Sequence, residues 1–459
     1  MILGLMSSET FKAHWSLNAR RRIFYKFPQG AAPLMALLSL LEPESTDKPE
    51  FGWYEKDFTE QQAVTTAIDV DSGPFSTTGT STPLTEAGWT ATINTIIRVR
   101  LEANGSEQYL VNNTVWVMDV PLAAGGFTQL YGQVTSIPAT NAIEIRLLQP
   151  VAAAVLNNQN QAGLNVLVIG SAYGEGVVNN SSEKWSPPIL PVNFTQILRK
   201  KFSFPRTALK VGAKFDKTGL YKDKAKENSL RHMMDLEKAF LFGTKSSFVT
   251  TIDGEDSVVR TTGGVIYWLQ QYEAAFSIFR GGDGVSVGPA AVTLDSDDDK
   301  RIINNAAGTI TPKSYAKYLE RVFRRCNNKA QEKLVLCGSG FLETINQMYF
   351  GSTTLNSNLP LEATYGMNVV RHQTPHGLVY YKSHPLFNLR GARFYYDALF
   401  LDVHNLIYRP LNDSDTKMVD RSMPNADKRV DEWITESGLE LRMPESHLWL
   451  RNVRDYLPA

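Results

Sequence analysis

The longest helix candidate constrains the fold of this chain more than any other feature. Residues 217–242 contain no proline, and after Gly219 no glycine occurs until Gly243. The large apolar residues near its end recur at helical spacing: Leu230, Met233, Leu236, Phe240 and Leu241. We predict a helix over 217–243, about 37 Å long at 1.5 Å per residue, that ends at Gly243.

Residues 88–175 have a different pattern, in which short apolar runs alternate with turn residues. Ile97, Val99 and Leu101 are separated by Arg98 and Arg100, which is the period of a half-buried strand. Further strands are predicted over 114–120, 132–137, 143–148 and 164–169, with glycine, asparagine, proline and alanine between them. This spacing predicts a small antiparallel barrel or sandwich.

Residues 250–435 alternate predicted strands with predicted helices. Thr311 followed by Pro312 is a typical helix start, and Tyr315, Leu319 and Val322 follow at helical spacing. A strand is predicted at 333–337, a helix at 341–350, and strands at 369–372, 378–381 and 394–401. Residues 439–453 alternate like one strand. With 459 residues, the chain should form two to four domains of mixed α+β class.

The N-terminal part reads as an extended segment that needs a partner. Residues 1–48 contain one short apolar stretch, 31–41, which we interpret as a helix with one packed face. Residues 49–85 have the small polar composition of turns, yet Phe51, Trp53, Tyr54 and Phe58 stand at their start. Large apolar groups beside a long polar loop predict packing on another chain.

The charge balance argues against a dedicated DNA-binding protein. The chain has 47 Lys plus Arg and 47 Asp plus Glu, so it lacks the basic excess by which such proteins neutralise phosphates. Neutrality also removes the self-repulsion that would oppose packing against many copies. Arg20–Arg22 is the candidate for weak, nonspecific contact with nucleic acid, and a solvated basic face is its competing interpretation.

The sequence offers little support for a metal, a membrane span or a disulfide. His372 and His376 are separated by Pro375, which rules against a helical metal pair, and residues 295–299 lack the glycine and glutamate of a calcium loop. No segment approaches the ~18–20 apolar residues of a membrane span. Cys326 and Cys337 are interpreted as reduced buried thiols, which suits assembly in a cytoplasm.

Catalytic patterns are equally weak. Residues 281–284 are glycine-rich but lack the ending of a phosphate loop. Ser339 lies between two glycines after a predicted strand, although the spacing of a nucleophile elbow is not met. We therefore predict no catalytic, cofactor-binding or metal-binding residues, and no enzyme. A hydrolase that uses Ser339 is the remaining enzymatic alternative.

Five segments in order resemble the major head (capsid) protein family of tailed bacteriophages. Residues 28–41 and Phe51-Gly52-Trp53 are similar to its front end, with an apolar "TPF" segment before a "FEW" strand. Residues 169–176 look like its "G-A-x-x-EG" junction after an inserted β-domain. Residues 193–197 resemble its "N-x-TQI" strand and 235–243 the end of its long helix. Glu436, Leu439-Glu440, His447 and Asn452 resemble its C-terminal "E-x-T-L-E … H … N" pattern.

The resemblance implies an α+β fold of the Hong Kong 97 phage type. Its parts here would be an N-terminal arm (1–48), an extended loop (49–85) and an inserted β-barrel-like domain (86–176). A peripheral domain (177–257) would contain the spine helix 217–243 and an axial domain would span 258–435. Residues 436–459 would return to the peripheral domain.

The resemblance also implies function and partners. The chain would self-assemble into hexamers and pentamers that form the icosahedral or prolate head around phage double-stranded DNA. Portal, scaffold and possibly decoration proteins would be further partners. The protein would reside in the virion after assembly in the host bacterial cytoplasm. An encapsulin-like cargo shell and a phage tail or head-completion protein are the alternatives.

Glu237 is a further residue with a testable role. It lies beside the apolar stripe of the predicted long helix, and an unpaired carboxylate there would be costly. We expect a cationic or hydrogen-bonding partner, with Arg442 and Arg451 of the returning C-terminal segment as candidates. A simple surface glutamate is the competing interpretation.

Overall fold

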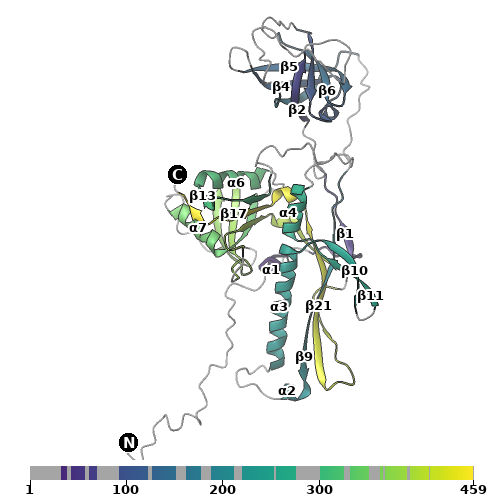
Figure 1. Ribbon diagram of the computed structural model, residues 1–459, viewed down its shortest axis with the longest axis vertical. Coiled ribbons are helices and arrows are strands. Elements are labelled where there is room, and N and C mark those ends of the chain that lie inside the picture. Colours follow the sequence, from purple (N-terminus) through teal and green to yellow (C-terminus); the bar gives the residue numbers. More distant parts are fainter. Residues whose placement is uncertain are drawn as a thin grey trace, which may run out of the picture. The chain divides into compact units, whose positions relative to one another are not determined.

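The chain divides into two compact units in the computed structural model (Figure 1). Unit 1 comprises Met1–Glu55 and Ile189–Ala459, and unit 2 comprises Lys56–Pro188. The structure describes residues 33–38, 43–56, 61–69, 93–121, 127–150, 162–176, 188–210, 220–252, 255–274, 300–324, 331–350, 362–364, 367–389, 393–412 and 414–457. Arg20–Arg22, Cys326 and residues 281–284 and 295–299, all discussed above, lie outside this part.

Unit 2 is a closed six-stranded barrel. Its order is β2 (Gln62–Asp69), β3 (Ile96–Leu101), β6 (Ala142–Leu147), β5 (Phe127–Ala139), β4 (Asn113–Pro121) and β7 (Asn165–Ser171), with β7 pairing back on β2. All its strand pairs are antiparallel. Alternate residues fill the interior, as the period-2 pattern predicted; Val115, Val117, Ile143 and Ile145 are buried.

The barrel is larger than the domain predicted from 88–175. Strand β2 lies within residues 49–85, which the composition suggested to be loop, and it closes the barrel between β3 and β7. A strand of this kind is hard to recognise because its buried positions carry Ala63 and Thr65, and a register shift after Thr65 then moves the next buried position to Ile68, which breaks the period of two.

The first layer of unit 1 is a long helix on an antiparallel sheet. Helix α3 (Leu220–Phe242) lies along β9 (Gln196–Pro205) and β21 (Lys428–Leu441), which run side by side over ten residue pairs (Figure 1). Strands β19 (Leu406–Pro410) and β20 (Lys417–Asp420) pair with the opposite edge of β21. The predicted helix over 217–243 and its end at Gly243 are confirmed within the described range.

Two short ribbons and two short helices adjoin this layer. Strand β1 (Glu50–Gly52) pairs with β8 (Val192–Phe194), and β10 (Ser246–Ile252) pairs with β11 (Glu255–Thr261) directly after α3. Helix α2 (Arg206–Lys210) continues from β9. Helix α1 (Pro33–Leu38) lies within the predicted helical stretch 31–41 and buries Leu34 and Leu38 in the core, as expected of a helix with one packed face.

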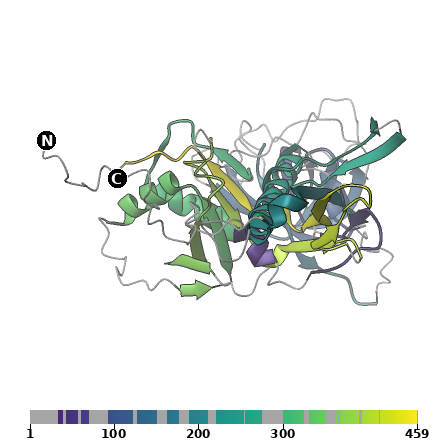
Figure 2. The same cartoon turned by 90° about the horizontal axis from the view of Figure 1, so that it is seen from below.

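The second layer of unit 1 is a seven-stranded mixed sheet. Its order is β12 (Ile302–Asn304), β22 (Leu448–Arg451), β18 (Ala398–Leu401), β14 (Glu332–Cys337), β17 (Gly377–Ser383), β16 (Met367–Thr374) and β15 (Glu362–Thr364). Helices α4 (Val265–Ala274), α6 (Pro312–Arg324) and α7 (Ser339–Phe350) pack around it (Figures 1 and 2). Strands β13 (Thr309–Ile310) and β23 (Asp455–Tyr456) form a separate parallel pair.

The seven-stranded sheet is buried on both faces. Along β14, Leu334 and Leu336 belong to one core cluster, which also contains α1, α3 and α4 residues, whereas Val335 and Cys337 belong to another with α6 and α7. This arrangement explains the continuous apolar run of β14, because a strand covered on both sides has no polar face. The helix at 312–324 buries the predicted stripe of Tyr315, Leu319 and Val322.

The C-terminal segment differs from the single alternating strand predicted over 439–453. Strand β21 ends at Leu441, Met443 adopts a left-handed backbone, and Pro444–Ser446 form a short 3-10 helix before β22. Proline at the start of that turn cannot donate to a ladder, so one continuous strand is excluded. Residues 428–441 therefore join the α3 layer and residues 448–451 join the seven-stranded sheet.

Candidate assembly junction

Glu237 on α3 lies at the meeting point of three parts of unit 1. Its side chain is fully buried. One carboxylate oxygen accepts hydrogen bonds from the Leu34 backbone N–H at 2.9 Å and lies 2.6 Å from His384 Nε2. The other oxygen accepts from the Met35 backbone N–H at 2.9 Å. The carboxylate thus connects α1 of the N-terminal segment, the long helix, and the residue that follows β17.

In this contact, the Glu237 side chain of α3 caps the N-terminal end of α1. The first N–H groups of α1 have no partner within their own helix, and a carboxylate satisfies them while stabilising the positive end of the helix dipole. His384 Nδ1 accepts from the Leu386 N–H at 3.1 Å, which assigns the imidazole proton to Nε2 and makes that atom the donor to Glu237. The expected hydrogen-bonding partner of Glu237 therefore exists.

The suggested partners Arg442 and Arg451 are wrong, however, because each serves another carboxylate. Arg442 Nε lies 2.5 Å from Glu440, which is fully buried, and Arg451 lies 3.5 Å from Asp397. Burial raises the pKa of Asp397, an effect that the Asn452 N–H and Arg451 partly offset. The sequence placed these arginines on the correct C-terminal segment but could not give their register against α3.

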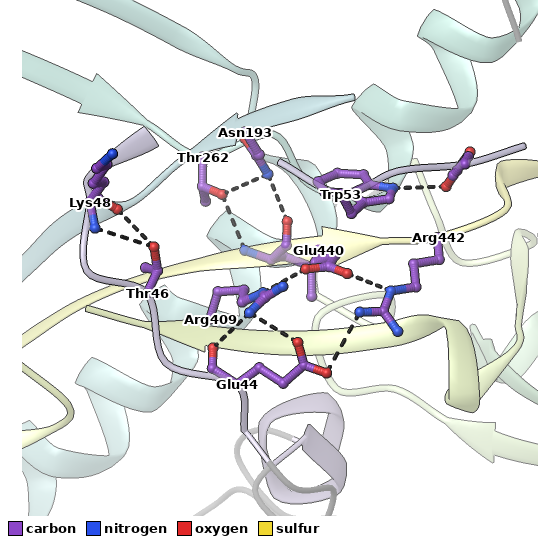
Figure 3. A network of polar contacts seen from close by, with 11 residues as sticks. Glu44, Thr46, Lys48, Trp53, Asn193, Thr262, Arg409, Glu440 and Arg442 are labelled. Atoms are coloured by element: carbon purple, nitrogen blue, oxygen red, sulfur yellow. Dashed lines mark hydrogen bonds and ion pairs between the residues drawn. The ribbon is translucent and has the colours of Figure 1, made fainter. Parts of the chain in front are cut away.

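Glu440 is the centre of a second contact between the N-terminal segment and β21 (Figure 3). Arg409 Nε and Arg442 Nε each lie 2.5 Å from one of its oxygens. Both guanidiniums also reach Glu44, which follows α1, at 3.0 and 3.6 Å. Two acids and two arginines thus form a closed charge network, and the buried member has two cationic partners.

Asn193 joins three further segments with one side chain (Figure 3). Its Nδ2 donates to the carbonyls of Leu439 at 2.7 Å and Gly263 at 3.0 Å, and its Oδ1 accepts from the Gly263 N–H at 2.8 Å. The same Nδ2 lies 3.2 Å from Thr262 Oγ1. Because the residue is fully buried and its amide uses both donor and acceptor atoms, neither leucine nor aspartate could replace it without leaving unsatisfied groups.

Neighbouring residues of the same segments extend the junction. Thr195 Oγ1 donates to Glu436 at 3.1 Å, and Gln196 Oε1 accepts from the Thr262 N–H at 3.2 Å. Trp53 packs edge-on against Trp268 and donates to Glu55, which in turn accepts from the Met443 N–H. Thus four of the five segments that carried the family resemblance, all except 169–176 of unit 2, contribute residues to this group of contacts and to the core cluster beneath it.

A separate buried ion pair fastens the seven-stranded sheet to the C-terminal segment. Lys333 Nζ lies 2.9 Å from Asp402 and donates to the Ser446 carbonyl at 2.9 Å, and neither charged side chain is exposed. The Asp402 N–H donates to His447 Nδ1 at 3.1 Å. Burial lowers the pKa of His447 to about 3, and the nearby Lys333 acts in the same direction, so the imidazole is neutral at physiological pH.

Ser339, the residue considered for catalysis, makes two hydrogen bonds to a neighbouring asparagine. The Ser339 hydroxyl donates to the Asn388 side-chain oxygen at 3.0 Å, and the Ser339 N–H donates to the same atom at 2.7 Å. Burial raises the pKa of Cys337 to about 12, so this thiol is protonated. Among the described residues, no group of three or more His, Cys, Asp and Glu side chains could hold a metal ion, and no helix is long and apolar enough to cross a membrane.

The model of the SU10 major capsid protein family matches residues 8–454, which is nearly the entire chain. The chain belongs to this family. A major capsid protein of Pseudomonas phage PaMx41 is 22% identical over 378 residues, covering 80% of this chain and 72% of the relative. The family match therefore confirms the major capsid protein family predicted from the five segments.

Solved structures with a related arrangement include a protein of Mycobacterium phage Adephagia. It is 8% identical, with 95% of this chain and 92% of that chain covered and a TM-score of 0.40. A capsid protein of a native GTA particle is 12% identical, with 61% and 80% covered and a TM-score of 0.38.

Family membership and the elements described above confirm the predicted fold class. The chain is an α+β member of the SU10 major capsid protein family, with a closed six-stranded β-barrel inserted within residues 56–188. Sequence reasoning found Glu237 and the Asn193 segment but missed His384 as the partner of Glu237 and Glu44 as a member of the Glu440 network. No local sequence pattern relates His384 to a residue 147 positions away.

Proposed function

We propose that this protein assembles into hexamers and pentamers that form a closed icosahedral or prolate head around double-stranded phage DNA. The observation that carries the proposal is the family match over residues 8–454. The junction supports it, because it fastens the N-terminal segment to both layers of unit 1 and so prepares one rigid body for assembly.

Electron microscopy of the purified, expressed protein tests this proposal. We expect closed shells built from rings of six and five subunits. Open tubes or single rings would instead support a tail or head-completion protein. Closed particles that enclose a cargo protein and exclude nucleic acid would support an encapsulin-like shell.

We infer the following domain roles for the chain. Residues 1–48 would be the N-terminal arm, 177–257 the peripheral domain with its spine helix, and 258–435 the axial domain. The last segment, 436–459, would serve both domains, since β21 and β22 lie in different sheets. Residues 56–188 would be the insertion, displayed on the outer surface or at contacts between capsomers. Subunits should bury more than about 2,000 Å² each against their neighbours.

Portal, scaffold and decoration proteins are proposed partners, and DNA contact should be weak and nonspecific. The neutral net charge supports weak DNA contact, since phosphate contacts are the main source of DNA affinity. In filter-binding assays, the affinity for DNA should disappear as the salt concentration rises. Sequence-selective binding that persists at high salt would contradict weak, nonspecific contact. We also propose that the protein has no catalytic role, so Ser339→Ala should still assemble and should lose only the stability contributed by the hydrogen bond to Asn388.

A further inference from the structure

The β10–β11 hairpin presents apolar side chains on both of its faces. Val249 lies directly opposite Val258, so both point to the same face, and they are 65% and 51% exposed. Phe248, one position along, points to the other face and is 50% exposed. Within the described chain, each strand of this hairpin pairs with the other alone. An isolated two-stranded ribbon is marginally stable in water, so this one needs a covering surface.

The hairpin also carries negative charge toward its turn. The sequence from 253 to 256 is Asp-Gly-Glu-Asp, and Asp256 is exposed, with its Oδ1 accepting from Thr251 at 2.8 Å. One end of the hairpin follows α3 directly. At its other end, the Thr262 N–H donates to the side-chain oxygen of Gln196, the first residue of β9. From there the ribbon diverges from the rest of unit 1 (Figures 1 and 2). Asp256, which pairs with Thr251, therefore lies far along the ribbon from the pair of Ser246 and Thr261 at its base.

Strand β9 presents the complementary surface. It pairs with β21 on one edge, and the described chain supplies no strand to its other edge. Ile197 is 55% exposed, and Arg199 and Lys201 follow it on the face directed away from α3, whereas Lys200 between them pairs with Asp235 of α3 at 2.5 Å. A free strand edge with exposed apolar and basic side chains is a template for another chain.

The acids of the β9 sheet on this face are Glu432 and Glu436, which stand opposite Lys201 and Ile197. Glu432 lies 3.9 Å from Arg199 and also 3.3 Å from Arg421, and Glu436 accepts a hydrogen bond from Thr195. One carboxylate thus serves two guanidiniums, and Lys201 adds a further positive charge to the same face. An acidic, apolar partner would complement this surface, and the β10–β11 hairpin has both properties.

We propose that the β10–β11 hairpin of one subunit docks on the exposed edge and basic face of β9 of a second copy of this chain. This proposal rests on the proposed function, since it assigns one of the contacts by which the shell is built. Donor and acceptor are different surfaces of the same chain, so the contact repeats head to tail and can close into rings. Complementary charge would select the partner surface, and the valines and Ile197 would be buried in the contact.

Charge reversal and its rescue test the contact. Asp256→Lys and the double variant Arg199→Glu/Lys201→Glu should each lower the yield of closed shells by at least about tenfold, because like charges would face each other. The triple variant that combines them should regain most of the yield. Glu102→Lys makes the same charge change at an exposed site of unit 2 and should assemble like the wild type. Circular dichroism would establish that every variant is folded.

The outcomes separate this proposal from the proposed function. If wild-type protein forms shells and either charge-reversed variant does so equally well, the hairpin contact is wrong while the capsid role stands. A triple variant no better than its parents would also overturn the contact. If wild-type protein forms no shells, the capsid role fails. In that case, sedimentation of the small oligomers formed by the wild type and by the same variants still tests the hairpin contact.

Discussion

The barrel of unit 2 and the junction of unit 1 reach stability by different routes. Every strand of the barrel lies between residues 62 and 171, each barrel strand pairs with a neighbour in the closed ring, and the interior is a single apolar cluster. The junction instead joins Leu34 to Glu237 across 203 positions and Asn193 to Leu439 across 246 positions, through buried polar atoms. The barrel depends on an alternating pattern, and the junction depends on a few individual side chains.

This difference predicts how each region responds to mutation. An apolar cluster distributes its stabilisation over many contacts, so one truncation is tolerated. A buried polar junction concentrates its stabilisation in a few side chains, because removing one group leaves its hydrogen-bonding partners unsatisfied. The predictions below test that contrast in the order of their expected size, with hydrogen exchange as the common measurement because it reports unit 1 and unit 2 separately.

Glu237→Ala should have the largest effect. It leaves two backbone N–H groups of α1 and the His384 Nε2–H without an acceptor, and we expect a loss of about 3–5 kcal/mol of stability in unit 1. Peptides of α3 and β17 should exchange faster and shell yield should fall, while barrel peptides keep their protection.

Glu227→Ala is the matched control on the same helix. Glu227 pairs with Lys224 and Arg231 at the surface, and such pairs contribute about 0–1 kcal/mol. Wild-type yields of closed particles from Glu237→Ala would exclude a structural role for the buried carboxylate.

Asn193→Ala should come next, with a loss of about 1–3 kcal/mol in unit 1. The substitution removes the bonds to Leu439 and Gly263, so β8 loses its buried side-chain link to β21 and to the segment before α4. Asn228→Ala is the control, because Asn228 makes a local bond to the Lys224 carbonyl of its own helix. Urea unfolding followed by tryptophan fluorescence compares the two variants, and equal midpoints would contradict the importance of long-range polar contacts.

The sequence predicted the barrel strands and the long helix well, since periodicity is a local property. Strands at 114–120, 143–148 and 164–169 each match an observed strand to within a few residues, and α3 lies within 217–243. It also identified Glu237 as a residue that must have a partner, because burial of one helix face follows from the apolar stripe.

The partners of Glu237 could not be predicted from the sequence. They depend on which turn of α3 meets α1 and on how β17 ends, and both are set by packing between segments far apart in the chain. The same limit explains β2, whose small residues give no strand signal until the barrel closes around them. Local patterns predict elements, whereas the identity of contacts requires the tertiary register.

His447 predicts a pH dependence of unit 1 that the barrel should lack. Its pKa is lowered from 6.5 to about 3 in the folded chain, so the unfolded chain binds the extra proton between these values. The stabilisation is therefore complete above pH 6.5 and declines as pH falls, by at most about 1.4 kcal/mol per pH unit. His447→Asn retains an acceptor for the Asp402 N–H. Chemical unfolding at pH 7 and pH 5.5 should show a smaller decline in this variant than in the wild type.

Ile145→Val should have the smallest effect and should act on the barrel alone. Ile145 is fully buried between neighbouring strands, facing Ile97 on β3 and Val134 on β5 across the sheet. Removing one methylene from such a site costs about 0.5–1.5 kcal/mol, because the surrounding side chains partly fill the space. Exchange should accelerate in peptides of β3, β5 and β6 and stay unchanged in α3. The matched change in unit 1, Ile310→Val at another fully buried position, should give the reverse distribution. If Ile145→Val instead destabilised both units equally, they would unfold as one cooperative body, and the contrast between a locally built barrel and a long-range junction would lose its energetic meaning.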